Sequence, residues 1–352
     1  MLKPETNLEW AYFAATTVQA VVITALQLTV LFRYLDWVNP VVYQVPLSYT
    51  APISIAVFVG GCIYQSFLTI DAFRIKNNIQ LFAQCICNIC LSISSAMQYG
   101  QIKKAVHRVT KGYDMFHTPF AKLDIPFWSQ TNPLLIASIV VVFGCTVAMC
   151  YLAYKLHREF AWALYKDISA DINIRSRYLT YQVYLVLIKL SLYFLVAFII
   201  VYGFVNVHYV QPEFSLTIAI IPVSILQIGL AVYYTRVEAA LGMAFTILVY
   251  LGGIAYLISR IIVLCGNSLY SKTTLKDEQL LFAIVAIFFI FAATVSAVQC
   301  WLNFGKGLKP ILLGQTQRKA PQNEEEREYY FQRLNYAPSA VDVGGNRRFA
   351  LD

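Results

Sequence analysis

The sequence predicts an all-α fold, a polytopic bundle of transmembrane helices, and three observations lead to this class. Eight long apolar stretches fill most of the 352 residues, and nearly every charged residue lies between them. Hydrophobic residues make up 59% of the chain and charged residues only 13%, about half the share that is usual in soluble domains. The mean hydropathy is +0.59. Because a bilayer offers no water to backbone amides, each stretch is expected to cross it as a helix.

The eight stretches are interpreted as eight membrane spans because most are about 20 residues long, the length that crosses the hydrocarbon core as a helix. Their predicted bounds are 10–31, 50–70, 79–98, 133–154, 179–205, 215–234, 239–264 and 280–302. The third span is the weakest, since it contains Gln80, Gln84, Asn88 and Gln98. It is either a helix buried among its neighbours or a re-entrant segment, and burial is favoured because such side chains are costly facing lipid. A bundle of seven spans is the alternative.

Lysine and arginine residues indicate the orientation of the spans. If both termini are cytosolic, the cytosolic segments carry roughly twice as many Lys and Arg residues as the opposite side, which is the bias expected of membrane proteins. The segment 101–132, which is predicted to be a loop, departs from this bias, because it places five basic residues on the non-cytosolic side. It also contains several aromatic residues, so it either rests on lipid headgroups or forms a lid over a cavity between helices.

The chain divides into a helical bundle at 1–305 and a cytosolic tail at 306–352. The tail is polar and has a charged run at 324–328. It can bury too little apolar surface to fold alone, so it is expected to be largely disordered and to bind cytosolic proteins. The lipid bilayer is the partner that the composition itself requires. The net charge of +8 does not indicate nucleic-acid binding, because the basic residues are spread over several loops. No oligomeric state is indicated.

Lys189 is the strongest candidate for an intramembrane functional site. It lies about 12 residues beyond Arg177, which ends a basic cluster at the membrane interface, so it reaches about the bilayer midplane. No acidic residue is expected at that depth, and an unpaired ammonium would occupy a watery cavity, bind an anion or be neutral. The alternative is a lysine satisfied by the interface or by polar neighbours. Gln84, Asn88 and Gln227 complete the candidate site, although such residues usually join helices by hydrogen bonds.

A charge cluster is expected at the cytosolic ends of the spans. Asp71 and Arg74 lie one helical turn apart at the end of the second span, where they can pair. Arg236 and Glu238 occupy the tight turn between the sixth and seventh spans, and the basic segment 155–178 lies on the same side. The predicted cluster consists of Asp71, Arg74, Arg158, Arg177, Arg236 and Glu238. A structural role is favoured over a surface that docks a partner.

Catalytic and metal-binding patterns are not found in the sequence. It contains none of the common nucleotide-binding, metalloprotease or serine-hydrolase motifs, and its four histidines are scattered among loops. Cys85, Cys87 and Cys90 form C-x-C-x-x-C, but on a helix positions 85 and 87 point about 200° apart, so the thiols do not converge on a metal. No enzyme activity, cofactor or metal is therefore predicted.

Several stretches of the chain are similar to a known family. The longest is KLHREFAWALYKDISADINIRSRYLTYQVYLVLIKLSLYF from Lys155, and shorter ones are DAFRIKNNIQLFAQCICN from Asp71, LTIAIIPVSIL from Leu216, NFGKGLKP from Asn303 and the final NRRFALD. Together they resemble a fungal family of multi-span Golgi apparatus membrane proteins whose molecular function is uncharacterised. The resemblance covers most of the chain. It implies a fungal origin and a Golgi or related endomembrane location, and it implies no reaction. Ser191 departs from the family pattern, which often has an acidic residue beside the intramembrane lysine.

Three functions are compatible with these features. The first is a non-catalytic Golgi membrane protein that acts by contact in trafficking, sorting or as a scaffold, which the tail and the basic loop favour. The second is a small-solute or ion transporter with a polar cavity around Lys189. The third is a seven-helix receptor, which needs an odd number of spans. The first function is preferred, because no residues suggest a reaction and the count of spans is even.

Overall fold

The computed structural model describes residues 6–39, 46–75, 78–113, 117–122, 124–167, 172–207, 212–266 and 275–306. The helices all belong to one compact unit, Met1–Leu308. The predicted disordered tail lies outside the described residues, apart from its first residue.

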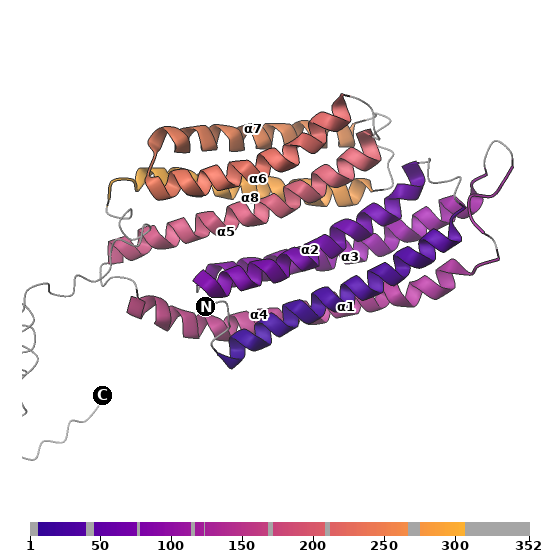
Figure 1. Cartoon of the computed structure of the whole chain (residues 1–352), viewed down its shortest axis with the longest axis horizontal. Coiled ribbons are helices and arrows are strands. Elements are labelled where there is room, and N and C mark those ends of the chain that lie inside the picture. The colour runs from indigo at the N-terminus through magenta and orange to yellow at the C-terminus, as the bar shows by residue number, and fades with distance from the viewer. Residues whose placement is uncertain are drawn as a thin grey trace, which may run out of the picture. The chain divides into compact units, whose positions relative to one another are not determined.

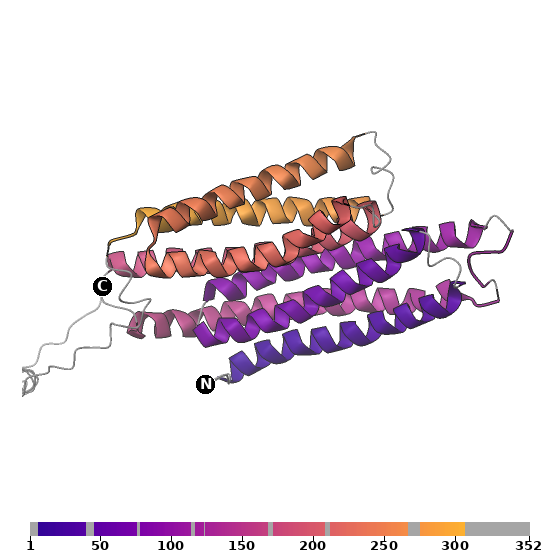
Figure 2. The same ribbon diagram turned by 45° about the horizontal axis from the view of Figure 1, so that its top comes forward.

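Within the described residues, eight helices confirm the all-α fold, and each is long and apolar enough to cross a membrane. They are α1 (Asn7–Trp37), α2 (Pro46–Ile75), α3 (Asn78–Lys111), α4 (Phe127–Asp167), α5 (Ile172–Val201), α6 (Glu213–Val237), α7 (Ala240–Cys265) and α8 (Lys276–Leu302). A π-helical turn, η2 (Tyr202–Val207), continues α5. Consecutive helices run antiparallel (Figure 1 and Figure 2), so odd-numbered helices begin at one end of the bundle and even-numbered helices at the other. We call these the N-terminal end and the far end.

The helices extend beyond the apolar stretches that predicted them, and local signals fix several of their ends. Thr6 caps α1, because its hydroxyl accepts a hydrogen bond from the backbone N–H of Glu9 at 3.3 Å. Glu238 ends α6 in the left-handed region, with φ of 60°. The hairpin that follows is tight: a Cβ on Gly242 would lie 2.4 Å from the ring of Tyr234. Glycine therefore allows α7 to begin directly against α6.

The helices form two groups of four, α1–α4 and α5–α8 (Figure 1), which lie side by side in both ribbon views. Within each group, neighbours in sequence pack together and the first helix packs against the last. The groups meet where α2 and α3 contact α5, and where α3 contacts α8. Buried side chains such as Phe58, Phe194 and Phe289 form an apolar cluster at this junction. The junction therefore has the character of a protein core.

The position of each helix decides how much of it faces the bilayer. In the apolar 18-residue stretch of α5, 61% of the residues are buried within the protein. The corresponding stretches of α6 and α7 are only 17% and 11% buried. Large side chains such as Leu226 and Leu248 are exposed on these outer helices. In a membrane, such surfaces contact lipid or the helices of other proteins.

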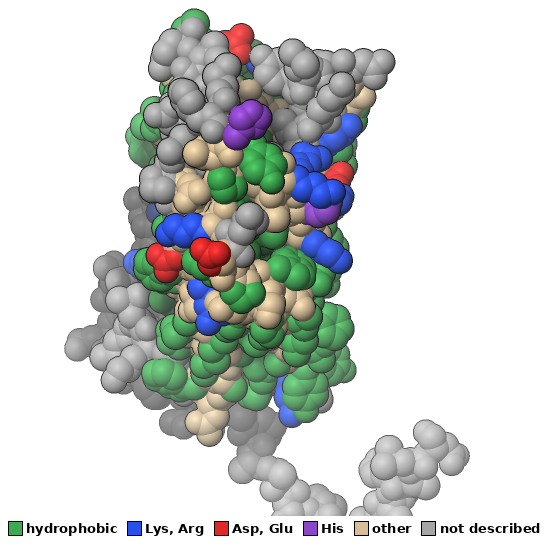
Figure 3. Space-filling view, turned by 90° about the vertical axis from the view of Figure 1, so that its right-hand side faces the viewer, with side chains coloured by type: hydrophobic (Ala, Val, Ile, Leu, Met, Phe, Trp, Pro, Cys, Tyr) green, Lys and Arg blue, Asp and Glu red, His purple; other side chains and the backbone are tan. Residues whose placement is uncertain are grey.

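The segment 101–132 is not a loop throughout, and here the sequence prediction is wrong. α3 continues as a helix to Lys111, and α4 already begins at Phe127. The extension of α3 is amphipathic, since Ala105 and Val109 are fully buried while its basic side chains are exposed. Figure 3 shows the far end of the bundle, where Lys and Arg side chains gather over apolar ones. High charge marked this segment as a loop, although its apolar residues follow helical spacing.

The described part of the remaining connection packs against the end of α1. The side-chain amide of Asn39 donates to the carbonyl of Pro119 at 2.7 Å. Trp37 stacks on Phe127, with ring centroids 4.8 Å apart. The first contact holds the connection to the residues that follow α1, and the second joins the end of α1 to the start of α4. The described residues of this connection line neither of the two cavities described below, and the lid over a cavity stays a prediction.

Candidate functional site

A line of buried polar side chains along α3 joins this helix to its neighbours. Its members each bond to a different set of helices: Gln80 to Asp71 of α2, Gln84 to Tyr12 of α1 and Thr69 of α2, Asn88 to Gln19 of α1 and Thr146 of α4, Ser94 to Glu278 of α8, and Gln98 to Gln27 of α1. None of the five α3 side chains is more than 2% exposed. In a membrane interior such a bond contributes about 0.6 kcal/mol on average. The third span is therefore a buried helix, as predicted, and not a re-entrant segment.

Gln84 and Asn88, two of the predicted site residues, lie in the core of the α1–α4 group. The hydroxyls of Tyr12 and Thr69 each donate to Gln84 Oε1 at 3.2 Å. Gln19 and Asn88 exchange two hydrogen bonds of 2.8 and 3.1 Å. Neither Gln84 nor Asn88 lines one of the two cavities. Their contacts are those of residues that join helices.

Lys189 has a carboxylate partner, which corrects the prediction of an ammonium without a counter-ion. Its Nζ donates to Asp71 Oδ2, so an ion pair connects α5 to α2. Gln80 Nε2 donates to the same oxygen at 3.1 Å. Asp71 therefore pairs with Lys189 and not with Arg74, the partner expected from the sequence. The prediction failed because depth was counted along one helix alone. α5 begins at Ile172, and seventeen residues into it Lys189 reaches the level of the last turns of α2.

Two members of the predicted charge cluster meet at the end of α8. Arg177 Nη1 donates to the carbonyl of Lys306 at 2.5 Å. The backbone N–H of Gly305 donates to the carboxylate of Glu238 at 2.9 Å. These bonds tie the start of α5 and the α6–α7 turn to the residues that follow α8. Their role at this position is to hold helix ends together.

The other members of the cluster lie apart from this point. Arg236 Nε donates to the hydroxyl of Tyr181 at 3.2 Å, which links α6 to α5. Arg74 is exposed at the end of α2, and Asp71 turns toward Lys189. The side chain of Arg158 lies outside the described residues. The six predicted residues therefore do not form one described cluster.

Glu278 is a fully buried carboxylate that the sequence analysis missed. It lies in the first turn of α8 and is 0% exposed. The hydroxyls of Ser54 and Ser94 donate to Oε1 at 3.3 and 3.4 Å, and Oε2 has no hydrogen-bond partner. The predicted span began at residue 280, which placed Glu278 outside the membrane. Helical spacing was the available signal, because Glu278 precedes the buried Phe282 by one turn and so shares its face.

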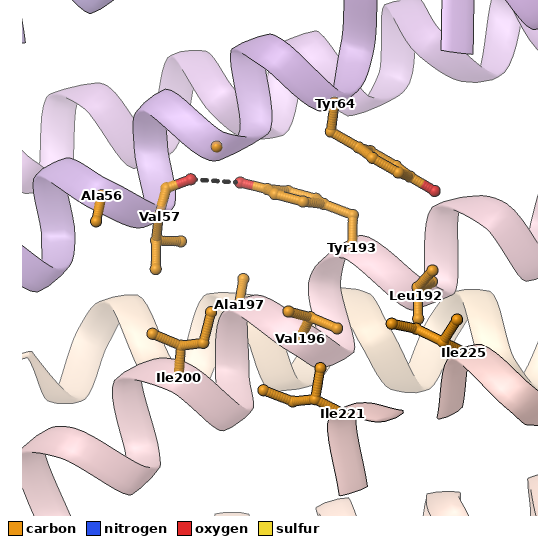
Figure 4. Close-up of a pocket in the computed structure, with 11 residues that line it drawn as sticks. Ala56, Val57, Tyr64, Leu192, Tyr193, Val196, Ala197, Ile200, Ile221 and Ile225 are labelled. Carbon is orange, nitrogen blue, oxygen red and sulfur yellow. Dashed lines mark hydrogen bonds between the residues drawn. The ribbon is translucent and has the colours of Figure 1, made fainter. Parts of the chain in front are cut away.

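A cavity of about 330 Å³ lies at the junction of the two groups, and we call it the junction cavity (Figure 4). Its lining comes from α2, α5 and α6 and is almost entirely apolar. Ala56 of α2 lies on one side, and Ile221 and Ile225 of α6 lie on another. Gly60 of α2 also belongs to the lining. Ile225 is 56% exposed. The cavity therefore opens on the outer surface of the bundle, at a depth where the surroundings are lipid.

Tyr193 forms one wall of the junction cavity. Its ring stacks on Tyr64 with centroids 5.8 Å apart, and its hydroxyl donates to the carbonyl of Val57 at 3.3 Å (Figure 4). Gly61 makes this position possible, because a Cβ there would lie 2.3 Å from the Tyr193 hydroxyl oxygen. At Gly60, by contrast, an added Cβ would meet nothing within 4 Å. Gly61 therefore gives the Tyr193 side chain the room it needs, and Gly60 leaves the space beside it unfilled.

Gln227 lines a second cavity, of about 320 Å³, within the α5–α8 group. The structure thus separates the four predicted site residues. Gln84 and Asn88 lie in the other group, and Lys189 bridges the two groups. Within the described residues, no three His, Cys, Asp or Glu side chains are placed to bind a metal ion.

The eight candidate membrane spans of the described residues, joined by a line of polar bonds between helices, define the class: a polytopic integral membrane protein with an all-helical core. The chain is similar to a UPF0658 Golgi apparatus membrane protein of the fission yeast Schizosaccharomyces pombe. The two are 24% identical over 275 residues, which cover 73% of this chain and 77% of the relative. This similarity confirms the resemblance found in the sequence. No family model matches the chain, and no solved structure matches it.

Proposed function

We propose that this protein acts by contact within Golgi membranes, where its junction cavity holds a membrane-spanning helix of another protein during sorting or scaffolding. The observation that carries the proposal is the exposed face of α2 at Ala56 and Gly60, which opens into this cavity. The Golgi location is supported by the fission yeast relative, which is named as a Golgi apparatus membrane protein.

The exposed face of α2 has the geometry of a helix contact in membranes. Ala56 and Gly60 are four residues apart, so they lie on one face of the helix. Small residues at this spacing allow two backbones to approach closely, and membrane helices associate through such faces. None of the described residues fills the space at Gly60, since an added Cβ would meet no atom within 4 Å. The face is therefore available to a helix from outside the chain.

The depth and chemistry of the cavity suit a membrane-spanning partner. Every lining residue belongs to a candidate span of α2, α5 or α6, so an occupant must lie within the bilayer. The lining carries no charged side chain. An apolar helix is therefore preferred to a polar one, because an unpaired charge would be costly there.

The two other functions have less support. The transporter hypothesis rested on a polar cavity around Lys189, but this residue is paired with Asp71 and lines neither cavity. The receptor hypothesis needed an odd number of spans, and the described residues contain eight. Contact through the junction cavity has structural support, because α2 of one group and α5 and α6 of the other form its lining.

Site-specific crosslinking in membranes tests the proposal. A photoreactive amino acid, p-benzoylphenylalanine, is placed at Ile225, on the rim of the cavity, in the full chain expressed in fungal cells. The matched control carries it at Leu226, the next residue of α6, which is 65% exposed and does not line the cavity. The expected result is a protein adduct at position 225 whose crosslinked peptide maps to a membrane-spanning segment of the partner. Position 226 is expected to give mostly lipid adducts.

A blocking substitution makes the result specific. Gly60→Leu fills the cavity from α2, so it is expected to remove the adduct at position 225, whereas Gly144→Leu on the exposed face of α4 leaves it in place. Lipid adducts alone at position 225, or a protein adduct that survives Gly60→Leu, would overturn the proposal.

A further inference from the structure

We propose that the second cavity, which we call the α5–α8 cavity, binds an uncharged lipid that carries a hydrogen-bond acceptor oxygen. Its volume is about 320 Å³, and all four helices of the group contribute to its lining. Most of the lining is aliphatic, with a few polar groups among it. A largely apolar cavity with few polar groups is the usual form of a site for a small apolar ligand.

Gln227 is the polar group that points to a ligand. Its side chain is 7% exposed, and its Nε2 has no hydrogen-bond partner. Buried amide donors are almost always satisfied in folded proteins, so an open donor in a cavity needs an explanation. The hydroxyls of Ser191 and Ser224 in the lining donate to the carbonyls of Ile188 and Ile221 at 2.9 and 2.7 Å. Neither hydroxyl oxygen accepts from the Gln227 amide, whose Nε2 has no hydrogen-bond partner among the described residues. An acceptor oxygen on the ligand would satisfy the Gln227 amide.

The absence of charge from the described lining sets the class of ligand. No acidic or basic side chain faces the cavity. Arg260 of α7 is not part of the lining; it lies over the rings of Tyr202 and Tyr256, its Nη1 donates to the Tyr202 hydroxyl at 3.1 Å, and its Nε has no hydrogen-bond partner. No lining side chain would pair with a phosphate or ammonium group, and burying such a charge without a partner is strongly unfavourable. Hydroxyl or carbonyl oxygens, as in diacylglycerols and sterols, carry no such penalty.

The depth of Gln227 agrees with a neutral lipid. It lies near the middle of α6, which runs from Glu213 to Val237. The ligand oxygen must therefore enter the membrane interior, and an uncharged group can do so far more easily than a phosphodiester. The site therefore favours lipids whose polar group can move from the membrane–water interface into the membrane interior.

Two adjacent glycines of α7 keep the cavity open. At both Gly252 and Gly253, an added Cβ would meet nothing within 4 Å. Larger side chains at these positions would occupy the cavity itself. The α5–α8 cavity shares only Leu192 with the junction cavity, and it does not depend on the proposed helix contact.

Photolabelling of the full chain in lipid nanodiscs tests the site. Three photoactivatable probes are compared: a diacylglycerol, cholesterol, and a phosphatidylcholine of the same acyl length. Labelled peptides are mapped by mass spectrometry. Gly253→Leu fills the cavity, Gln227→Met removes the donor at nearly constant length, and Gly229→Leu is the matched control on the exposed face of α6.

Labelling of the lining by a neutral probe is expected in the native protein and in Gly229→Leu. It should be blocked by Gly253→Leu and reduced about fivefold by Gln227→Met, the effect of losing one neutral hydrogen bond. The probe that labels more strongly distinguishes a diacylglycerol-like from a sterol-like ligand. Equal labelling in all variants, or equal use of the site by phosphatidylcholine, would overturn the proposal. If Gly253→Leu elutes as an aggregate, Gln227→Met alone decides.

Discussion

The ion pair between Asp71 and Lys189 gives a prediction that separates this structure from the simplest interpretation of the sequence. Asp71→Asn leaves the Lys189 ammonium without a carboxylate, and Lys189→Met leaves the carboxylate with only the Gln80 amide. Each change is therefore expected to weaken the contact between α2 and α5. The double substitution removes both charges and should cost less than the sum of the two.

The exposure of the pair sets the size of the effect. Exposed ion pairs contribute about 0.2–1 kcal/mol, and breaking a fully buried pair costs about 3–5 kcal/mol. The side chains of Lys189 and Asp71 are 24% and 35% exposed, which places the pair between these limits. We expect a coupling energy of about 2 kcal/mol between the two residues.

A double-mutant cycle measures this coupling. The free energy of unfolding is obtained by SDS titration of the purified protein in mixed micelles, with circular dichroism as the signal. Arg74→Met provides the matched control, since Arg74 is exposed one turn from Asp71. Coupling of Asp71 to Arg74 should be near zero. Coupling to Arg74 as large as that to Lys189 would refute the structural assignment.

Three further predictions concern Glu278, the paired glycines of α2 and the tail. Glu278→Gln keeps an oxygen that can accept from the two serines and cannot carry a charge, so the unfolding free energy should stay equal or rise. Glu278→Ala leaves the two serine hydroxyls without this acceptor and should lower the unfolding free energy by about 1–3 kcal/mol; the reverse order would contradict the burial. Gly61→Ala places a Cβ 2.3 Å from the Tyr193 hydroxyl and should lower the unfolding free energy by about 1–3 kcal/mol in the same titration. Gly60→Ala should change the unfolding free energy by less than about 1 kcal/mol. Equal effects of the two substitutions would count against the described position of Tyr193. Truncation after Lys309 should leave unfolding unchanged and remove binding to cytosolic proteins in a pull-down, and a less stable bundle would refute the division into bundle and tail.

The fold was predictable from the sequence because one property determines it. Apolar stretches of about 20 residues have few alternatives to a membrane-spanning helix, so all eight spans were found. The ends of the helices were less predictable. The extension of α3 to Lys111 carries a basic face, and its buried Ala105 and Val109 are too few to mark a span. Amphipathic extensions depend on what packs against them, which hydropathy alone does not record.

The candidate site was predicted only in part, because its contacts depend on the relative heights of helices. Lys189 was recognised as unusual, but its partner on α2 was assigned to the interface, and the offset between α2 and α5 brings the two together. Gln84 and Asn88 were identified as polar residues within a span, and their partners on other helices became known only from the structure. Gly60 and Gly61 were a weak indication of the junction cavity in the sequence. The sequence does not show that Gly61 packs against Tyr193 while Gly60 faces open space.

The central claim is that the junction cavity holds membrane-spanning helices of other proteins in the Golgi. The most direct test compares the membrane proteins of purified Golgi fractions from cells whose sole copy is native, Gly60→Leu or Gly144→Leu, with quantitative mass spectrometry as the measurement. Gly60→Leu is expected to deplete a defined set of membrane-spanning proteins, while Gly144→Leu matches the native protein. An unchanged set of Golgi membrane proteins in Gly60→Leu cells, with the variant present at the native level, would contradict the claim.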